Sequence, residues 1–235
     1  MRVEIWSDVV CPWCYIGKRR LEAALAQFDH RDEVEVVWRS FELDHRAPRT
    51  REGSYAGRLA RKYGMTTEQA QAATARLSRL ADAEGVAFQL DDARPGNTFD
   101  AHRLLHLAAE RGVQDRAKER FMAAYFTEGA AIGEPETLVA LATDAGLAAD
   151  EVQAVLDGDG YAEAVRADEE EATELGATGV PFFVVDGRYA VPGAQDTDVF
   201  LRVLERAWAA EHRPVVVGDT GVGAAGACED GSCTT

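Results

Sequence analysis

Residues 2–15 read RVEIWSDVVCPWCY, and this stretch joins a strand pattern, a Cys-Pro-Trp-Cys motif and the start of a helix. Its first residues alternate in polarity and predict a strand over residues 2–7. Leu21, Leu25 and Phe28 then share one helical face, which predicts a helix over residues 12–28. Proline suits the first helical position, where its missing N–H costs nothing, so Cys11 is expected at the N-cap.

This placement of the two cysteines predicts a thiol–disulfide site. The N-terminus of a helix carries about half a positive charge and unpaired N–H donors, which favour the thiolate form of Cys11. Cys14 lies one turn further on, close enough to form a small disulfide with it, so one thiol would attack and the other resolve. The same spacing also serves zinc and iron–sulfur sites, but zinc sites normally need a second ligand pair nearby.

The composition excludes several classes of partner. The 235 residues include 41 acidic and 25 Lys or Arg residues, and the formal charge of −16 repels nucleic acid and anionic membrane surfaces. We find neither a secretory signal nor an apolar run of transmembrane length. Four cysteines in two close pairs suit catalytic thiols in a reducing compartment, so a cytoplasmic protein without nucleic-acid or membrane partners is expected.

The order of the predicted elements indicates an α/β protein. A strand, a helix and a second strand at residues 34–43 open the chain, and helical patterning follows for about a hundred residues. Two strands around Asp186-Gly187, a hairpin turn signature, and a helix at residues 197–211 close it. We therefore predict a thioredoxin domain formed by residues 1–45 and 176–212, an inserted all-helical domain at 46–160, a bridging helix at 161–175, and a flexible tail at 213–235.

These features together resemble the DsbA-like thioredoxin superfamily, and most closely its FrnE-like branch, over residues 1 to about 212. The matching segments are Asp8 with Cys11-Pro12-Trp13-Cys14-Tyr15, Asn97-Thr98, His102-Arg103, Gly179-Val180-Pro181-Phe182-Phe183 and Gly193-Ala194-Gln195. The resemblance implies a protein disulfide oxidoreductase or isomerase in which Cys11 attacks and Cys14 resolves. It also implies a cis Val180–Pro181 bond beside the disulfide. The implied substrate-binding residues are Pro12, Trp13, Val180, Pro181, Asn97 and His102.

The resemblance also indicates the reaction partners. We expect disulfide-containing or dithiol polypeptides as substrates, glutathione as a possible thiol reductant, and no cofactor beyond the Cys11–Cys14 disulfide. Trp13 offers no cation where DsbA has a histidine, so a weaker oxidant than DsbA is expected. The sequence does not indicate an oligomeric state.

Two other functions fit parts of the sequence. Kappa-class glutathione transferases and hydroxychromene carboxylate isomerases share the fold and the helical insertion, but they typically use serine at the position of Cys11. A zinc-binding thiol sensor would hold the metal with both cysteine pairs. His102 and His106 also lie one helical turn apart, a spacing compatible with metal binding, but no third local ligand accompanies them, and no metal site is predicted.

The predicted tail contains the second cysteine pair. Cys228 and Cys233 flank a turn-forming Asp-Gly-Ser, so a disulfide between them is geometrically easy. A tethered dithiol could reduce the Cys11–Cys14 disulfide if the tail folds back over the cleft. The alternative is an incidental pair at a disordered end.

Overall fold

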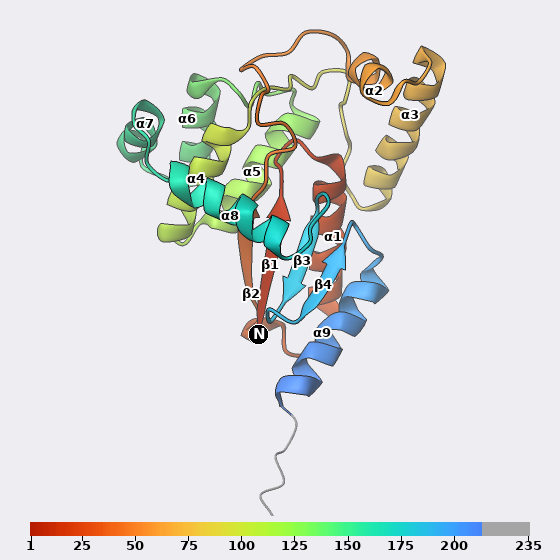
Figure 1. The fold of residues 1–235 in the computed structure, drawn as a ribbon, viewed down its shortest axis with the longest axis vertical. Coiled ribbons are helices and arrows are strands. Elements are labelled where there is room, and N and C mark those ends of the chain that lie inside the picture. The colour runs from red at the N-terminus through yellow and green to blue at the C-terminus, as the bar shows by residue number, and fades with distance from the viewer. Residues whose placement is uncertain (213–235) are drawn as a thin grey trace, which may run out of the picture.

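The computed structural model describes residues 1–212, and at its centre lies a four-stranded sheet (Figure 1). Its strands stand in the order β2-β1-β3-β4 and span β1 Arg2–Ser7, β2 Glu35–Ser40, β3 Phe182–Val185 and β4 Tyr189–Pro192. β1 runs parallel to β2 and antiparallel to β3, so Ile5 lies opposite both Trp38 and Phe183. Segments nearly 180 residues apart thus form adjacent strands.

Helices surround this sheet and form most of the segment between β2 and β3. They are α1 Pro12–Gln27, α2 Tyr55–Tyr63, α3 Thr67–Ala83, α4 Phe99–Glu110, α5 Gln114–Thr127, α6 Pro135–Asp144, α7 Ala149–Asp157, α8 Ala162–Glu174 and α9 Thr197–Glu211, with a 3-10 helix at Arg31–Glu33. Within residues 1–212, none of these helices has the length and apolar character needed to cross a membrane.

The alternation of strand side chains places two helical layers on the sheet. Val3 and Ile5 of β1 pack with α1 and α9 on one face, through residues such as Leu21 and Phe200. Trp6 points to the other face, where Phe182 and Val184 of β3 pack against Ala172 of α8. In Figure 1, α2 and α3 lie beyond the N-terminal end of α1, away from the helices α4–α7.

A second, larger apolar core joins the start of α1 to the helical segment. Cys11, Cys14 and Tyr15 belong to the same buried cluster as Leu104 of α4 and Phe121 of α5. Tyr15 also stacks on Phe88 and contacts Phe126, with ring centroids 6.0 and 5.8 Å apart. The two cysteines therefore lie where the helical segment meets the sheet-bearing half of the molecule.

The element pattern predicted from the sequence is confirmed with shifts of a few residues. β1 and α9 begin and end as predicted, β3 and β4 flank Asp186-Gly187 as predicted, and β2 is shorter than predicted and covers residues 35–40. Asp186 and Gly187 both have positive φ, 49° and 62°, as the predicted hairpin turn requires. Gly176 ends α8 with φ 82°. The domain division at residues 46–160 stays a prediction, and the predicted tail at 213–235 lies outside the described residues.

Candidate active site

The first turn of α1 presents the two cysteines as its sequence predicts. Cys11 is the N-cap residue, in extended backbone conformation, and Pro12 occupies the first turn. The amide of Cys14 donates to the carbonyl of Cys11 at 3.1 Å. Both residues are free thiols, with exposed fractions of 3% and 1%. A pair at this position can attack and resolve disulfides, since the helix N-terminus favours negative charge on Cys11.

The loop before β3 lies against Cys11. The Cys11 thiol donates to the carbonyl oxygen of Val180, with Sγ 3.7 Å from that oxygen, and the Val180–Pro181 peptide bond is cis. Gly17 permits the close approach, because a Cβ there would lie 3.2 Å from both Cγ of Pro181 and Cζ of Phe183. Two segments about 170 residues apart thus meet at the nucleophile.

Three buried charged or polar side chains surround the inner side of the site. Asp8 accepts the amide of Leu43 at 2.8 Å, and its other oxygen lies 3.5 Å from Nε2 of His102. Nζ of Lys118 donates to the carbonyl of Ser7 at 3.2 Å. Asp8, His102 and Lys118 are each at most 1% exposed. Burial of this kind shifts the proton affinities of Asp8 and Lys118.

The pKa values of these groups follow from burial and from their neighbours. Burial raises the pKa of Cys14 well above its ordinary value, and the adjacent Cys11 adds to this effect. Burial lowers the pKa of Lys118 to about 8, although the nearby Cys14 and Asp8 act in the opposite direction. Burial alone would raise the pKa of Asp8, but His102 and the Leu43 amide hold it below its ordinary value.

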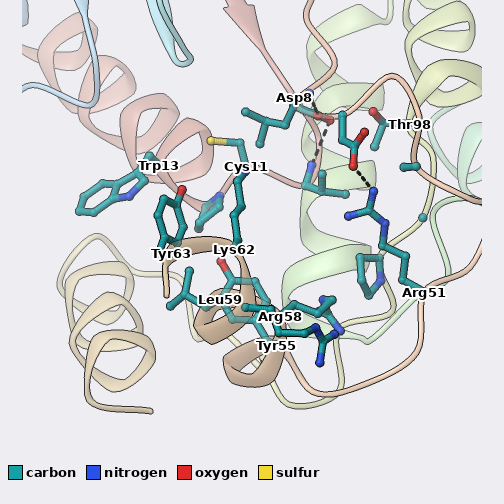
Figure 2. Close-up of a pocket in the computed structure, with 18 of the residues that line it drawn as sticks. Asp8, Cys11, Trp13, Arg51, Tyr55, Arg58, Leu59, Lys62, Tyr63 and Thr98 are labelled. Atoms are coloured by element: carbon teal, nitrogen blue, oxygen red, sulfur yellow. Dashed lines mark hydrogen bonds and ion pairs between the residues drawn. The ribbon is translucent and has the colours of Figure 1, made fainter. Parts of the chain in front are cut away.

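A cleft of about 1100 Å³ opens beside Cys11. Figure 2 shows residues of α2, among them Tyr55, Lys62 and Tyr63, opposite Cys11 and Trp13. Six of the nine residues of α2 line the cleft, namely Tyr55, Arg58, Leu59, Arg61, Lys62 and Tyr63. Our sequence analysis missed α2 as part of the site. The signal available there was local, a Ser54 N-cap before a segment that combines three cations with two tyrosines.

The structure brings some of the predicted binding residues to the cleft and not others. Pro12, Trp13 and Val180 line it, and Trp13 is 44% exposed. Asn97 instead accepts the amide of Phe99 at 2.9 Å at the start of α4. His102 is fully buried behind Asp8, so both residues hold the structure beside the cleft rather than form its wall. Cys228 and Cys233 lie outside the described residues.

The two histidines of α4 face different partners. His102 lies beside Asp8, whereas Nε2 of His106 lies 3.1 Å from both the hydroxyl of Ser40 and the carboxylate of Asp168. Among the described residues, the one group with metal-ligand spacing consists of Glu42, His45 and Glu169. The guanidinium of Arg166 contacts all three of these side chains and already supplies a cation there.

Comparisons with known proteins agree with this geometry. The chain is 28% identical over 206 residues to the uncharacterized protein YwbO of Bacillus subtilis, covering 87% of this chain and 96% of that protein. It is 51% identical to a probable DsbA oxidoreductase of Streptomyces coelicolor of known structure, with a TM-score of 0.86 and 94% of each chain covered.

A more distant structure shares the fold. The cytosolic disulfide reductase DsbM of Pseudomonas aeruginosa, which has also been solved with GSH, is 20% identical, with a TM-score of 0.59, and the match covers 89% of this chain and all of that one. The sequence model of the DSBA-like thioredoxin domain matches residues 2–205. On this match over nearly the whole chain, the protein belongs to the DSBA-like thioredoxin domain family.

Proposed function

We propose that this protein is a thiol–disulfide oxidoreductase in which Cys11 attacks the substrate disulfide and Cys14 resolves the intermediate. One observation carries the proposal. The Cys11 thiol caps α1, lines the cleft, and lies 3.7 Å from the carbonyl oxygen of Val180. A sulfur in this position has a helix N-terminus on one side and a polar backbone acceptor on the other.

The reaction proceeds by two thiol–disulfide exchanges. The Cys11 thiolate attacks one sulfur of the substrate disulfide, and the other sulfur leaves as a thiolate that takes up a proton. Cys14, as thiolate, then attacks the Cys11 sulfur of the mixed disulfide and releases the second substrate thiol. The substrate gains two electrons and the enzyme disulfide forms. A thiol reductant, for which we propose glutathione, returns the enzyme to the dithiol.

The buried environment controls the second exchange. Cys14 must lose its proton, and burial raises its pKa well above the ordinary value. The nearby Lys118 favours the Cys14 thiolate and so acts against the burial effect. We therefore expect resolution to depend on Lys118 more strongly than the first attack by Cys11 does.

Substrate, direction and location complete the proposal. Polypeptide disulfides and small disulfides both fit the proposed chemistry, and we assign the chain to the FrnE-like branch on its Cys-Pro-Trp-Cys motif. We place it in the cytoplasm, in keeping with its pairs of close cysteines and its likeness to a cytosolic reductase.

Because Trp13 brings no cation to the motif, we expect a weaker oxidant than DsbA. Equilibration with glutathione buffers measures this, and a DsbA-like potential would refute it.

The test of the main proposal compares three proteins in insulin reduction and in reactivation of scrambled ribonuclease. We expect Cys11→Ser to abolish both activities, because it removes the nucleophile. Cys14→Ser should instead accumulate mixed disulfide with substrate, visible by mass spectrometry as an adduct on Cys11. A transferase or isomerase would keep its turnover in Cys14→Ser, and that result would favour the alternative functions.

The tail pair needs a separate experiment. We propose that Cys228 and Cys233 relay electrons to the Cys11–Cys14 disulfide. The Cys228→Ser/Cys233→Ser double variant should then show slower turnover with a reductant that reaches the tail more readily than the cleft. Unchanged kinetics with every reductant would show that the second pair is incidental.

A further inference from the structure

The wall of the cleft that faces Cys11 combines cations with aromatic rings. α2 contributes Arg58, Arg61 and Lys62, and the side chains of Tyr55 and Tyr63 accompany them. The guanidinium of Arg58 lies 5.7 Å from the ring of Tyr55, and Nζ of Lys62 lies 5.7 Å from the ring of Tyr63. The protein as a whole carries a charge of −16, so this is an unusual concentration of positive charge.

The three cations of α2 form no ion pair within the described part of the chain, although the carboxylates of Asp8, Asp44 and Glu52 also line the cleft. Arg51, which also lines the cleft, pairs with Asp44. Arg58 donates to the carbonyl of Gly53, but no carboxylate lies within ion-pair distance of Arg58, Arg61 or Lys62 among residues 1–212.

Arg58 also has an unsatisfied donor. Its Nη2 atom is buried and has no hydrogen-bond partner among those residues. A buried donor without an acceptor is costly, so Arg58 gains from any acceptor that its guanidinium can reach.

Large apolar side chains gather at the same cleft. Five such side chains of the described chain are exposed, and four of them line this cleft: Trp13, Leu43, Tyr63 and Met65. Exposed apolar side chains that cluster around a concave surface indicate a binding site for an apolar group. The ligand chemistry that fits both observations is an apolar or aromatic body carrying an anionic group.

The dimensions of the site favour a small molecule. The cleft volume of about 1100 Å³ is slightly above the range of about 300–1,000 Å³ that is typical of small-molecule sites. Cys11 is only 3% exposed and lies within the cleft, so a small disulfide reaches it more readily than a disulfide on the surface of a folded protein. A low-molecular-weight disulfide can enter and bring its sulfur to Cys11.

Building on the proposed function, we propose that the cleft selects a low-molecular-weight aromatic disulfide that carries carboxylates. The carboxylate contacts Arg58 and Lys62, and the ring packs among Trp13, Tyr63 and Met65. Cys11 attacks the near sulfur and releases one aromatic thiol. Cys14 then displaces the second thiol and forms the enzyme disulfide, which the proposed glutathione reductant returns to the dithiol.

The experiment is a single-turnover measurement with two probes. Dithiobis(nitrobenzoate) is an aromatic disulfide with a carboxylate on each ring, and dithiodipyridine is an uncharged aromatic disulfide. The reduced wild type is compared with Arg58→Gln/Lys62→Gln, and with Lys62→Gln alone in case the double variant is unstable. Arg76→Gln is the matched control, because Arg76 is an exposed cation of the neighbouring α3 outside the cleft.

We expect the double variant to slow the reaction with dithiobis(nitrobenzoate) about ten-fold relative to wild type, a typical effect for two partly buried ion pairs. Lys62→Gln should have a smaller effect of the same kind, whereas Arg76→Gln should have none. The reaction with dithiodipyridine should change less than two-fold. Added salt should slow the reaction of the wild type with dithiobis(nitrobenzoate) but not with dithiodipyridine, since salt screens the attraction between the cations and the carboxylates.

Three results would overturn this inference. Equal slowing with both probes would mean that α2 affects Cys11 itself and does not recognise the carboxylate. Unchanged rates in both α2 variants would exclude the cations from recognition. A third probe is a peptide disulfide flanked by acidic residues. If its reaction rate depends on Arg58 and Lys62 more strongly than the rate with dithiobis(nitrobenzoate) does, the site would be assigned to polypeptides. If neither probe modifies Cys11 in the wild type, the proposed function itself fails, and this result is distinct from the other three.

Discussion

Two buried lysines contact Trp38, and their surroundings differ. Lys18 of α1 and Lys118 of α5 place their ammonium groups 5.9 and 5.3 Å from the centre of a Trp38 ring. Lys118 has one hydrogen-bond acceptor within residues 1–212, the carbonyl of Ser7. Lys18 forms ion pairs with three carboxylates, those of Glu22, Asp115 and Glu119.

The two lysines therefore have opposite pKa shifts. Burial alone would lower the pKa of Lys18, but Asp115 and Glu22 more than reverse this effect and raise it. Burial lowers the pKa of Lys118 to about 8, because its neighbours do not compensate fully. The comparison teaches that close carboxylate partners can reverse the effect of burial on the pKa of a lysine. The uncompensated ammonium is the one placed near Cys14.

The largest expected effect is on the pH dependence of stability. Because the pKa of Lys118 is lower in the folded chain, the unfolded chain binds more protons between pH 8 and 10.5. The free energy of unfolding of the wild type, relative to Lys118→Met, should therefore rise across this window by about 3 kcal/mol. Well below pH 8 the difference should stay constant. Urea titrations at a series of pH values measure it.

The matching control is Lys18→Met. The stabilisation from a raised pKa is fully present below the unfolded value of 10.5 and is lost above it, so the wild-type and Lys18→Met curves should run parallel across the same window. All variants carry serine in place of Cys11 and Cys14, which removes thiol ionisation. Because both thiols raise the pKa of Lys118, the rise in this background begins somewhat below pH 8. Parallel curves for Lys118→Met as well would contradict the proposed difference between the two lysines.

A second expected effect is on catalysis. Lys118→Met removes a positive charge that lowers the pKa of Cys14, so resolution of the mixed disulfide should slow near neutral pH. We expect the resolution rate to fall about ten-fold. The lifetime of a mixed disulfide between Cys11 and a fluorescent thiol measures the step. Lys18→Met should leave this lifetime unchanged, and equal lifetimes in all three proteins would show that Lys118 does not act on Cys14.

The smallest effect concerns the stability contributed by the Lys18 ion pairs. Lys18→Met should lower the free energy of unfolding by about 1 kcal/mol, because the carboxylates left behind are partly exposed and water can solvate them. High salt should reduce the loss, since it screens the original pairs. A loss that does not respond to salt would mean that packing against Trp38, and not charge, sets the contribution of Lys18.

The cysteine site follows from short-range signals, which explains why the sequence predicts it. The Cys11 N-cap, the proline after it and the strand before it all depend on neighbouring residues. His102 shows where this reasoning stops. Its spacing from His106 is compatible with a shared metal ion, although no metal site was predicted, and the structure turns the two rings toward Asp8 and Asp168 on different elements. Helical spacing does not specify what packs against each side chain.

The sequence by itself determined the strand and helix pattern, the hairpin turn at Asp186-Gly187 and the cysteine pair at the start of a helix. Local propensity, apolar periodicity and capping are sufficient for these features. Only the tertiary structure decided that α2 faces Cys11 across a cleft and that Lys118 contacts Ser7, 111 residues earlier. Such contacts arise when separate apolar faces are buried together, and the charge state of a buried lysine then depends on neighbours that packing supplies.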